Sequence, residues 1–262
     1  MSAPVLRGLG IVVTRPKNQA ENLVRLIDAA GARPILFPVL EILDVSDLNP
    51  LYHVIKELDH YHAAIFISPT AVNKAMNLIK AQREWPRELA VFAIGRGSKK
   101  ALEHCGVHNV QIPPGRSDSD ALLELPALQD MRNKRVVIFR GDGGREVLGD
   151  ELVKRGAELT YAECYRRSKP NIEAGALLYH WARNELDAVT VTSSEGLHNL
   201  FDLVGKLGQQ WLKKTPVFVT HPRIATIAEE LGLEKVIVTG PEDQDLMAGL
   251  EEWANESRTP RR

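Results

Sequence analysis

Short runs of apolar residues alternate with longer amphipathic stretches along the chain. Gly10–Thr14 is typical of a buried strand, and Pro16 follows where the start of a helix tolerates proline. Apolar residues then recur at helical spacing: Ala20, Leu23, Leu26, Ile27 and Ala30. Gly31 follows as a natural C-cap. The first forty residues therefore begin with a strand followed by a helix.

Further strands are expected along the rest of the chain. They lie at Pro34–Val45 (interrupted by Pro38), Ala63–Ile67, Ala90–Ile94, Asn109–Ile112, Arg135–Phe139, Leu159–Tyr165, Ala188–Thr192, Val217–Val219 and Lys235–Val238. A helical pattern follows nearly every one. Because continuous apolar strands alternate with helices, we predict an α/β fold with doubly wound parallel sheets that helices cover on both faces.

The chain also matches itself at an offset of about 125 residues. Arg15 aligns with Arg140, and Gly31-Ala32 aligns with Gly156-Ala157. Further along, Ile67-Ser68 aligns with Thr192-Ser193. A register held over several blocks indicates a duplication, and hence two similar lobes. Clefts between domains are preferred ligand sites, so we expect the functional loops to face such a cleft.

Composition narrows the class of protein. The chain has 262 residues, a net charge of −1, 44% hydrophobic and 26% charged residues, which is ordinary for a globular protein. This charge balance favours neither nucleic acid nor an anionic membrane as a partner. Cys105 and Cys164 have no metal-like spacing and fit reduced cytosolic thiols. No signal peptide and no apolar run of about 20 residues is visible, so we expect a cytoplasmic protein and, without a long apolar edge, a monomer.

The loops after the strands carry groups that suit anions. In a doubly wound sheet the ligand lies beyond the carboxyl ends of the strands. Several of these loops begin a helix with a polar side chain: Ser68, Ser98, Ser119, Ser193, Ser194 and His221. A helix N-terminus offers unpaired N–H groups and a positive dipole end. For any one serine the alternative is plain helix capping, but six such ends favour anion binding.

Arginines repeat in the same places. Arg15 and Arg140 are equivalent in the repeat and each directly follows a strand. Arg96, Arg145 and Arg223 lie in corresponding loops. Guanidinium groups suit carboxylates and phosphates, although a solvated surface charge is the alternative for each arginine taken alone.

Other chemistries fit poorly. Gly95-Arg96-Gly97 and Gly141-Asp142-Gly143-Gly144 lack the full dinucleotide pattern, although Glu163 follows the second at about the expected spacing. There is no Walker motif and no nucleophile elbow, and His104 with His108 has no second ligand cluster for a metal. An enzyme built this way would work by binding, positioning and electrostatics.

With these loops identified, the chain resembles the uroporphyrinogen-III synthases over nearly its whole length. The residues that carry the resemblance are Val12-Val13-Thr14-Arg15-Pro16, Phe66-Ile67-Ser68-Pro69-Thr70-Ala71-Val72, Ala93-Ile94-Gly95-Arg96-Gly97-Ser98, Arg140-Gly141 with Arg145-Glu146-Val147-Leu148, Cys164-Tyr165-Arg166-Arg167, and Thr192-Ser193-Ser194-Glu195-Gly196-Leu197. Their order and spacing together make the resemblance specific.

The resemblance implies a particular arrangement of domains. Domain 1 would be discontinuous, from residues 1–38 and 168–262, and domain 2 would be inserted as residues 41–165. Two crossing strands, near Val39–Glu41 and Tyr165–Ser168, would join them as a hinge, with the active site in the cleft between the domains.

The resemblance also implies a reaction. The family converts hydroxymethylbilane, a linear tetrapyrrole with eight carboxylates, into uroporphyrinogen III without a cofactor or metal. Loss of the terminal hydroxyl as water gives an azafulvene, and a spiro intermediate then leads to inversion of ring D. Free substrate closes spontaneously to the type I isomer. The preceding deaminase is a possible transient partner.

Tyr165 is the candidate catalytic residue, because it matches a family tyrosine whose phenol would act as general acid in the cleft. The alternative is an aromatic residue that packs at the domain crossing. The resemblance and the loops together give these substrate-binding candidates: Arg15, Ser68, Thr70, Gly95, Ser98, Arg140, Gly141, Arg145, Ser193, Ser194, His221 and Arg223. The His221–Arg223 loop departs from the family, which often has hydroxyl residues near Arg223 and Ile224.

Two alternatives of other classes remain open. A non-catalytic two-lobed binding protein for a polyanionic small molecule would share the lobes and the anion-binding loops. A pair of receiver-like regulatory domains would need acidic residues at the strand ends, where this chain has Arg, Ser and Gly.

Overall fold

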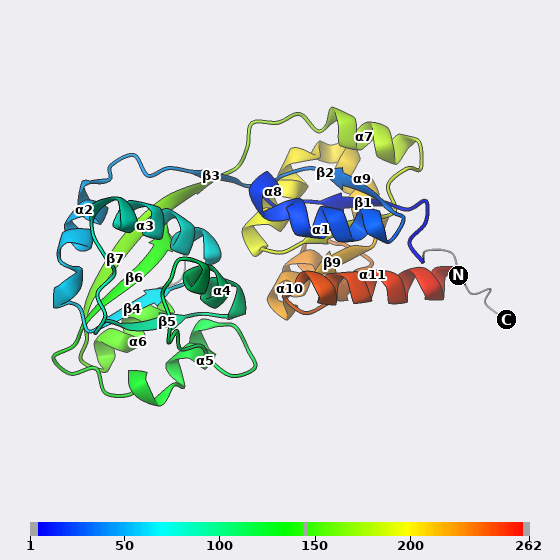
Figure 1. Cartoon of the computed structure of the whole chain (residues 1–262). Coiled ribbons are helices and arrows are strands. Elements are labelled where there is room, and N and C mark those ends of the chain that lie inside the picture. Colours follow the sequence, from blue (N-terminus) through cyan, green and yellow to red (C-terminus); the bar gives the residue numbers. More distant parts are fainter. Residues whose placement is uncertain (1–4, 144–145, 259–262) are drawn as a thin grey trace. The chain divides into compact units, whose positions relative to one another are not determined.

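The computed structural model describes residues 5–143 and 146–258. Contacts divide the chain into two compact units: unit 1 is Met1–Glu41 with Ser168–Arg262, and unit 2 is Ile42–Arg167. Each unit holds a five-stranded sheet with helices on both faces (Figure 1), so the predicted α/β class is confirmed.

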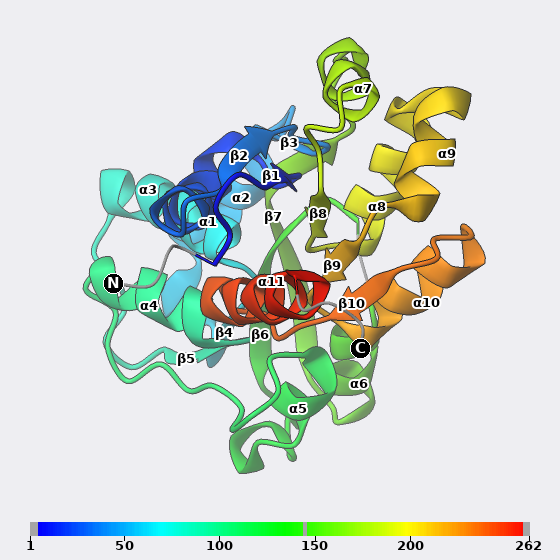
Figure 2. The same cartoon turned by 90° about the vertical axis from the view of Figure 1, so that its right-hand side faces the viewer.

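In unit 1 the strand order is β10-β9-β8-β1-β2, and every neighbouring pair is parallel. The strands are β1 (Gly10–Val13), β2 (Arg33–Leu36), β8 (Ala188–Val191), β9 (Val217–Val219) and β10 (Val236–Val238). One face packs against α1 (Lys17–Ala29) and α11 (Asp243–Arg258). The other packs against α7 (Gly175–Ala182), α8 (Ser194–Leu203), α9 (Gly205–Lys214) and α10 (Pro222–Glu230), as Figure 2 shows. Helices on both faces explain why all four residues of β1 are buried.

In unit 2 the strand order is β3-β7-β6-β4-β5, and β4, β5, β6 and β7 pair in parallel. The strands are β3 (Glu41–Leu43), β4 (Ala63–Phe66), β5 (Ala90–Ala93), β6 (Arg135–Gly141) and β7 (Glu158–Ser168). One core contains residues of α2 (Asn49–Lys56), α3 (Pro69–Gln82) and α4 (Arg96–His104). The core on the opposite face contains residues of α5 (Ser119–Leu123) and α6 (Val147–Lys154). Short 3-10 turns lie at Leu58–His60 and Pro126–Leu128.

The internal repeat reappears in the strand order. At the offset seen in the sequence, β1, β2, β8 and β9 correspond to β6, β7, β4 and β5, and both sets have the same neighbours. The predicted strand Asn109–Ile112 is wrong, since this segment makes only one bridge, Phe92↔Gln111. That bridge corresponds to Phe218↔Ile237 between β9 and β10. Asn109 has a left-handed φ of 61°, and Pro113 follows without an N–H, so the segment cannot extend into a full strand.

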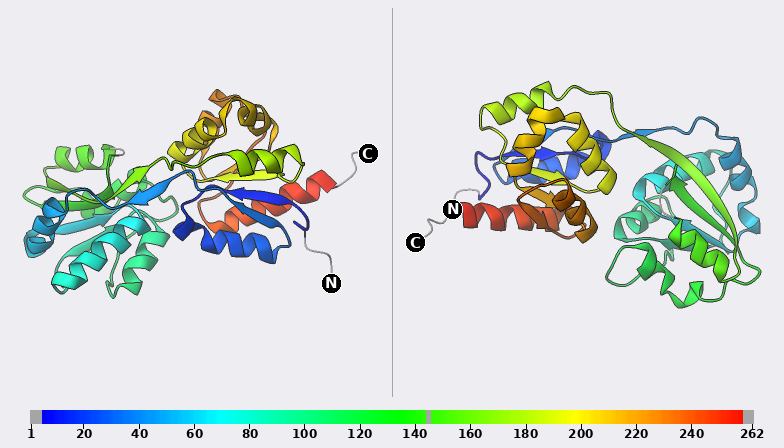
Figure 3. Two further views of the ribbon diagram at one scale, coloured as in Figure 1. Left: turned by 90° about the horizontal axis from the view of Figure 1, so that it is seen from above. Right: turned by 180° about the vertical axis from the view of Figure 1, so that it is seen from behind.

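The long segment expected at Pro34–Val45 is two strands. Residues 37–40 separate β2, in the sheet of unit 1, from β3, in the sheet of unit 2. Phe37 and Val39 still donate backbone hydrogen bonds to the end of β1, but Pro38 between them has no N–H to give. In unit 2, β3 lies beside β7, the 11-residue strand that extends along the sheet (Figure 3).

Candidate functional site

A β-bulge in β7 sets the direction of Tyr165. Arg140 pairs with Glu163, but Gly141 pairs with Tyr165, so Cys164 is an additional residue in β7. Side chains of a regular strand alternate between faces, yet Ala162, Cys164 and Tyr165 all join the core that α3 covers. The bulge therefore turns Tyr165 toward α3. Bulges of this kind are frequent next to active sites, where they redirect a side chain.

Two neighbours fix the phenol of Tyr165, which is only 6% exposed. Its Oη lies 3.1 Å from Ser68 Oγ. Its ring lies directly on Gly141, because a Cβ added there would be 2.6 Å from Cε2 and 2.7 Å from Cζ. Asp142 N also donates to Tyr165 O at 2.8 Å. The aromatic ring is thus placed at the carboxyl end of β6 by a glycine and by a hydroxyl from the loop after β4.

Ser68 is the N-cap of α3, as its position before Pro69 predicts. Its Oγ accepts a hydrogen bond from Ala71 N at 3.0 Å. Thr70 lies in the first turn of the same helix and is half-buried. Both residues are therefore at the N-terminus of α3, where the positive end of the helix dipole favours an anion.

Arg140 lies on the other face of the sheet and is only 5% exposed. The carbon of its guanidinium is 4.8 Å from the ring centroid of Tyr161, and its Nε donates to Gly141 O at 3.2 Å. Within residues 5–143 and 146–258 no carboxylate forms an ion pair with it. Burial of a charge without a partner is costly, so this arginine suits an anionic ligand.

Tyr161 completes the setting of Arg140. Burial raises the pKa of its phenol, and the charge of Arg140 acts in the opposite direction. A Cβ on Gly149 would lie 1.9 Å from Tyr161 Oη, so glycine in α6 makes room for the tyrosine. Sequence analysis missed Tyr161 and Gly149. The nearest signal was the position of Tyr161 four residues before Tyr165, but the bulge places the two rings on opposite faces.

The other candidates of unit 2 lie near α4 and in the loop before α6. Gly95 is the N-cap of α4, and Ser117 approaches it so closely that a Cβ would be 2.5 Å from Ser117 Oγ. Ser98 is 2% exposed inside the same helix. Arg145 lies outside the described residues. The roles of these three residues in binding stay predictions.

In unit 1, Arg15 differs from its repeat equivalent. It forms an ion pair with Asp243, the first residue of α11, and the two side chains are 14% and 16% exposed. Asn22 Nδ2 also donates to Asp243, at 2.6 Å. Arg15 thus has a carboxylate partner within the protein, whereas Arg140 has none in the described part of the chain. A substrate-binding role suits Arg140 better.

The remaining candidates of unit 1 lie at helix N-termini. Ser193 caps α8 by accepting from Gly196 N at 3.0 Å. Ser194 Oγ is buried, and no hydrogen-bond partner for it lies in the part of the chain that the structure describes. His221 caps α10, since its Nδ1 accepts from Arg223 N at 3.1 Å, which requires an unprotonated Nδ1. Arg223 is an exposed residue of that first turn.

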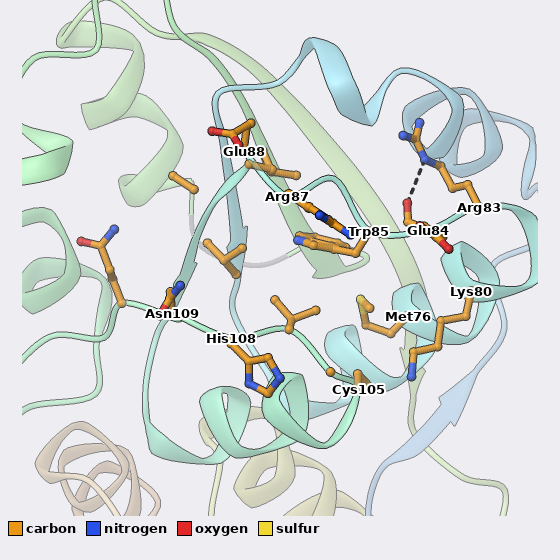
Figure 4. Close-up of a pocket in the computed structure, with 16 residues that line it drawn as sticks. Met76, Lys80, Arg83, Glu84, Trp85, Arg87, Glu88, Cys105, His108 and Asn109 are labelled. Atoms are coloured by element: carbon orange, nitrogen blue, oxygen red, sulfur yellow. Dashed lines mark hydrogen bonds between the residues drawn. The ribbon is translucent and has the colours of Figure 1, made fainter.

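A cavity of about 730 Å³ lies elsewhere in unit 2 (Figure 4). It is lined by the last turns of α3 and α4 and by the residues before and at the start of β5, with Lys80, Trp85, Arg87, Cys105 and His108 among them. Because β5 begins here, the cavity is at the amino end of the sheet. Ser68, Gly141 and Tyr165 belong to the carboxyl end, so the cavity is separate from the candidate site.

The described residues contain neither a metal-binding cluster nor a membrane-spanning helix. Among them no group of three or more His, Cys, Asp or Glu side chains is arranged to hold a metal, so His104 and His108 form no such cluster. None of the helices in that part of the chain has the length and apolar character needed to cross a membrane.

Solved structures share the fold. A mutant uroporphyrinogen III synthase of Thermus thermophilus gives a TM-score of 0.66 at 17% identity, covering 95% of this chain and 100% of that one. A uroporphyrinogen-III synthetase of Helicobacter pylori gives 0.56 at 14% identity, covering 95% and 99%.

Relatives found by sequence have a higher identity to this chain than these two solved structures have. The uroporphyrinogen-III synthase of Escherichia coli is 34% identical over 241 residues, which cover 91% of this chain and 98% of the relative. The enzyme of Salmonella typhimurium is 33% identical over the same shares of both chains. A family model described as Uroporphyrinogen-III synthase HemD matches residues 21–248. The chain therefore belongs to the uroporphyrinogen-III synthase family.

Proposed function

We propose that Tyr165 is the general acid of the uroporphyrinogen-III synthase reaction in this chain. The reaction is the dehydrative cyclisation of hydroxymethylbilane to uroporphyrinogen III. Its first step breaks a C–O bond, and the departing hydroxyl needs a proton to leave as water. The observation that carries the proposal is the placement of the phenol by a bulge, by a glycine and by Ser68 at the carboxyl end of β6.

The proposal also assigns carboxylate binding. Hydroxymethylbilane carries eight carboxylates, which need cationic or N–H partners. Arg140 is the strongest candidate because its buried guanidinium lacks an ion-pair partner in the described residues. The N-termini of α3 and α8 would bind further carboxylates, with the buried hydroxyl of Ser194 as an additional donor.

Catalysis in this proposal depends on positioning. Free hydroxymethylbilane closes spontaneously to the type I ring, so the protein must favour attack by the substituted end of the last pyrrole over direct closure. Anchored carboxylates restrict the conformation of the chain of pyrroles, which is where most of the selectivity would arise. Proton transfer by Tyr165 would contribute about 10²- to 10⁴-fold in addition.

Two finer points belong to the same proposal. A transient contact with the preceding deaminase would shorten the time in which free substrate closes spontaneously. A cytoplasmic location agrees with two cysteines that are both free thiols.

A coupled assay tests the function. The deaminase generates hydroxymethylbilane in the presence and absence of this protein, and the oxidised products are separated into type I and type III isomers. We expect predominantly type III product, and Tyr165→Phe should lower its rate without abolishing it. Tyr179→Phe, at a tyrosine of unit 1 that is 58% exposed, is the matched control.

The outcomes separate enzyme from binder. Only type I product at the spontaneous rate would reject the synthase function and leave the polyanion-binding alternative. Type III product with unchanged rate in Tyr165→Phe would retain the function and reject Tyr165 as general acid.

A further inference from the structure

We propose that Ser68 is a positioning residue for Tyr165, to which its hydroxyl donates a hydrogen bond. This donation directs the proton of the phenol away from Ser68 and stabilises the phenolate that forms when Tyr165 gives up that proton. The inference rests on the proposed role of Tyr165 as general acid. It changes the part expected of Ser68, from a ligand of substrate carboxylates to a partner of the catalytic group.

The hydrogen-bond capacity of Ser68 supports this direction. Its Oγ has one proton and two lone pairs, and one lone pair accepts from Ala71 N at 3.0 Å. The contact with Tyr165 Oη, at 3.1 Å, can in principle run either way. If Tyr165 donated, its proton would be held by Ser68 and would not reach a leaving group. If Ser68 donates, the phenol proton is available, and the bond favours the ionised form of Tyr165.

The internal repeat shows that capping alone does not require this contact. Ser193 caps α8 just as Ser68 caps α3, with Gly196 N at 3.0 Å from its Oγ. At the repeat offset the position of Tyr165 is occupied by Leu40, whose Cδ1 lies 3.8 Å from where a Cβ on Gly196 would be. An aliphatic side chain therefore stands beside the serine cap in unit 1. The bond between hydroxyl and phenol is an addition of unit 2.

Two structural features bring Tyr165 into contact with Ser68. The bulge at Cys164 turns Tyr165 toward α3, and Gly141 leaves room for the ring. A ring that was only filling the core would need neither a bulge nor a glycine at hydrogen-bond distance from a helix cap. Both features bring Oη to Ser68, which is what a positioned acid requires.

The proton balance closes without a further reactant. As the C–O bond of the hydroxymethyl group breaks, the Tyr165 proton goes to the departing oxygen and water is released. Ser68 keeps its own proton throughout and donates only a hydrogen bond to the phenolate. The pyrrole carbon that closes the ring later loses a proton, which restores the phenol of Tyr165.

A matched pair of variants tests the inference in the full chain. Asn and Asp have the same shape and both cap helices, so Ser68→Asn and Ser68→Asp should both satisfy Ala71 N. Asn retains N–H donors for Tyr165 Oη, whereas ionised Asp has none. We expect kcat for type III product to be about 10- to 100-fold lower in Ser68→Asp than in Ser68→Asn, since hydrogen bonds to charged groups are the strong ones. The alkaline limb of the kcat profile should also move to higher pH in Ser68→Asp.

Repeating the pair in a Tyr165→Phe background distinguishes the possible failures. With no phenol to position, Ser68→Asn and Ser68→Asp should then have equal rates. A difference that persists in that background would overturn the inference, because Ser68 would be acting on substrate directly. Equal rates with Tyr165 present would overturn it as well. If Tyr165→Phe alone keeps full activity, the proposed general acid itself is rejected.

A second pair guards against misfolding of the charged variant. Ser68→Thr retains the hydroxyl and Ser68→Val lacks it, and the two replacement side chains are nearly isosteric. Thermal unfolding reports the loss of the cap, and kcat compared between the wild-type and Tyr165→Phe backgrounds reports the loss of the donor. The ratio of the Ser68→Thr rate to the Ser68→Val rate should fall toward one when the phenol is absent, and a ratio that stays constant contradicts the inference.

Discussion

The contact between Gly141 and Tyr165 can be tested with one methyl group. In Gly141→Ala the new Cβ would lie 2.6 Å from Tyr165 Cε2, 2.7 Å from Cζ and 3.1 Å from Oη. Carbon atoms in contact are normally about 3.5–4.0 Å apart, so the ring must retreat by roughly 1 Å. Gly141 is not among the glycines with a left-handed φ, so the backbone itself accepts alanine.

The size of the effect follows from that displacement. Overpacking of a buried site typically costs about 1–3 kcal/mol, which should appear as a lower free energy of unfolding. A retreat of the ring also lengthens the 3.1 Å contact between Tyr165 Oη and Ser68 Oγ beyond hydrogen-bond distance. Because a misplacement of about 1 Å can cost roughly 10²-fold in rate, we expect kcat to fall by that order.

The assay combines isomer-resolved kinetics with denaturant unfolding. Gly175→Ala is the matched control, since a Cβ there meets nothing within 4 Å and Gly175 has no left-handed φ. In a Tyr165→Ala background the ring is gone, so Gly141→Ala should no longer reduce stability. Wild-type kcat and stability in Gly141→Ala, or a stability loss that persists without the ring, would refute the reasoning.

Three further predictions concern buried charges and thiols. Arg140→Met should raise KM for hydroxymethylbilane about tenfold or more without lowering the stability of the ligand-free protein. The reason is that the buried guanidinium lacks an ion-pair partner in the described residues. Lower stability with unchanged KM would contradict this expectation. Burial raises the pKa of the Cys164 thiol to about 12. Between pH 9 and 12 the folded state therefore keeps a proton that the unfolded state loses. The free energy of unfolding should fall over that range by up to about 1.4 kcal/mol per pH unit. Cys164→Val should flatten that fall, and native alkylation at pH 8 should label half-buried Cys105 and spare Cys164. Arg15→Ala should lower stability by about 1–3 kcal/mol by leaving Asp243 without its ion pair, and should change KM less than Arg140→Met does; the reverse order would exchange their roles.

The fold could be predicted from the sequence where the periodicity of apolar residues determines the secondary structure. Continuous apolar runs such as Ala63–Ile67 are strands because helices bury them on both faces, and the repeat predicted two sheets with equivalent strands. The prediction failed at Asn109–Ile112, where the pattern is that of a strand but the left-handed Asn109 and the following prolines limit pairing to one bridge. Local pattern does not report the hydrogen bonds that a segment can complete.

The site could be predicted only in part, because its most important contacts join residues that are far apart in the sequence. Arg15 and Arg140 are equivalent in sequence, yet one is paired with Asp243 and the other stacks on Tyr161. The direction of Tyr165 depends on a bulge at Cys164 that leaves no mark in the hydrophobic pattern. Helix caps at Ser68 and Ser193 were predictable because they depend on neighbours within three residues.

The strand order of unit 1 has a consequence for synthesis of the protein on the ribosome. Strand β1 lies between β8 and β2 in its sheet, and Ile11 pairs with Ala188, which is translated 177 residues later (188 − 11). At about 5–20 residues per second, β1 and β2 wait roughly 10–35 s with one apolar edge uncovered. Residues 42–167 emerge during that interval and can complete their own sheet. Nascent chains should therefore acquire a protease-resistant unit 2 first, while the amino-terminal strands remain a target for chaperones until β8 is made.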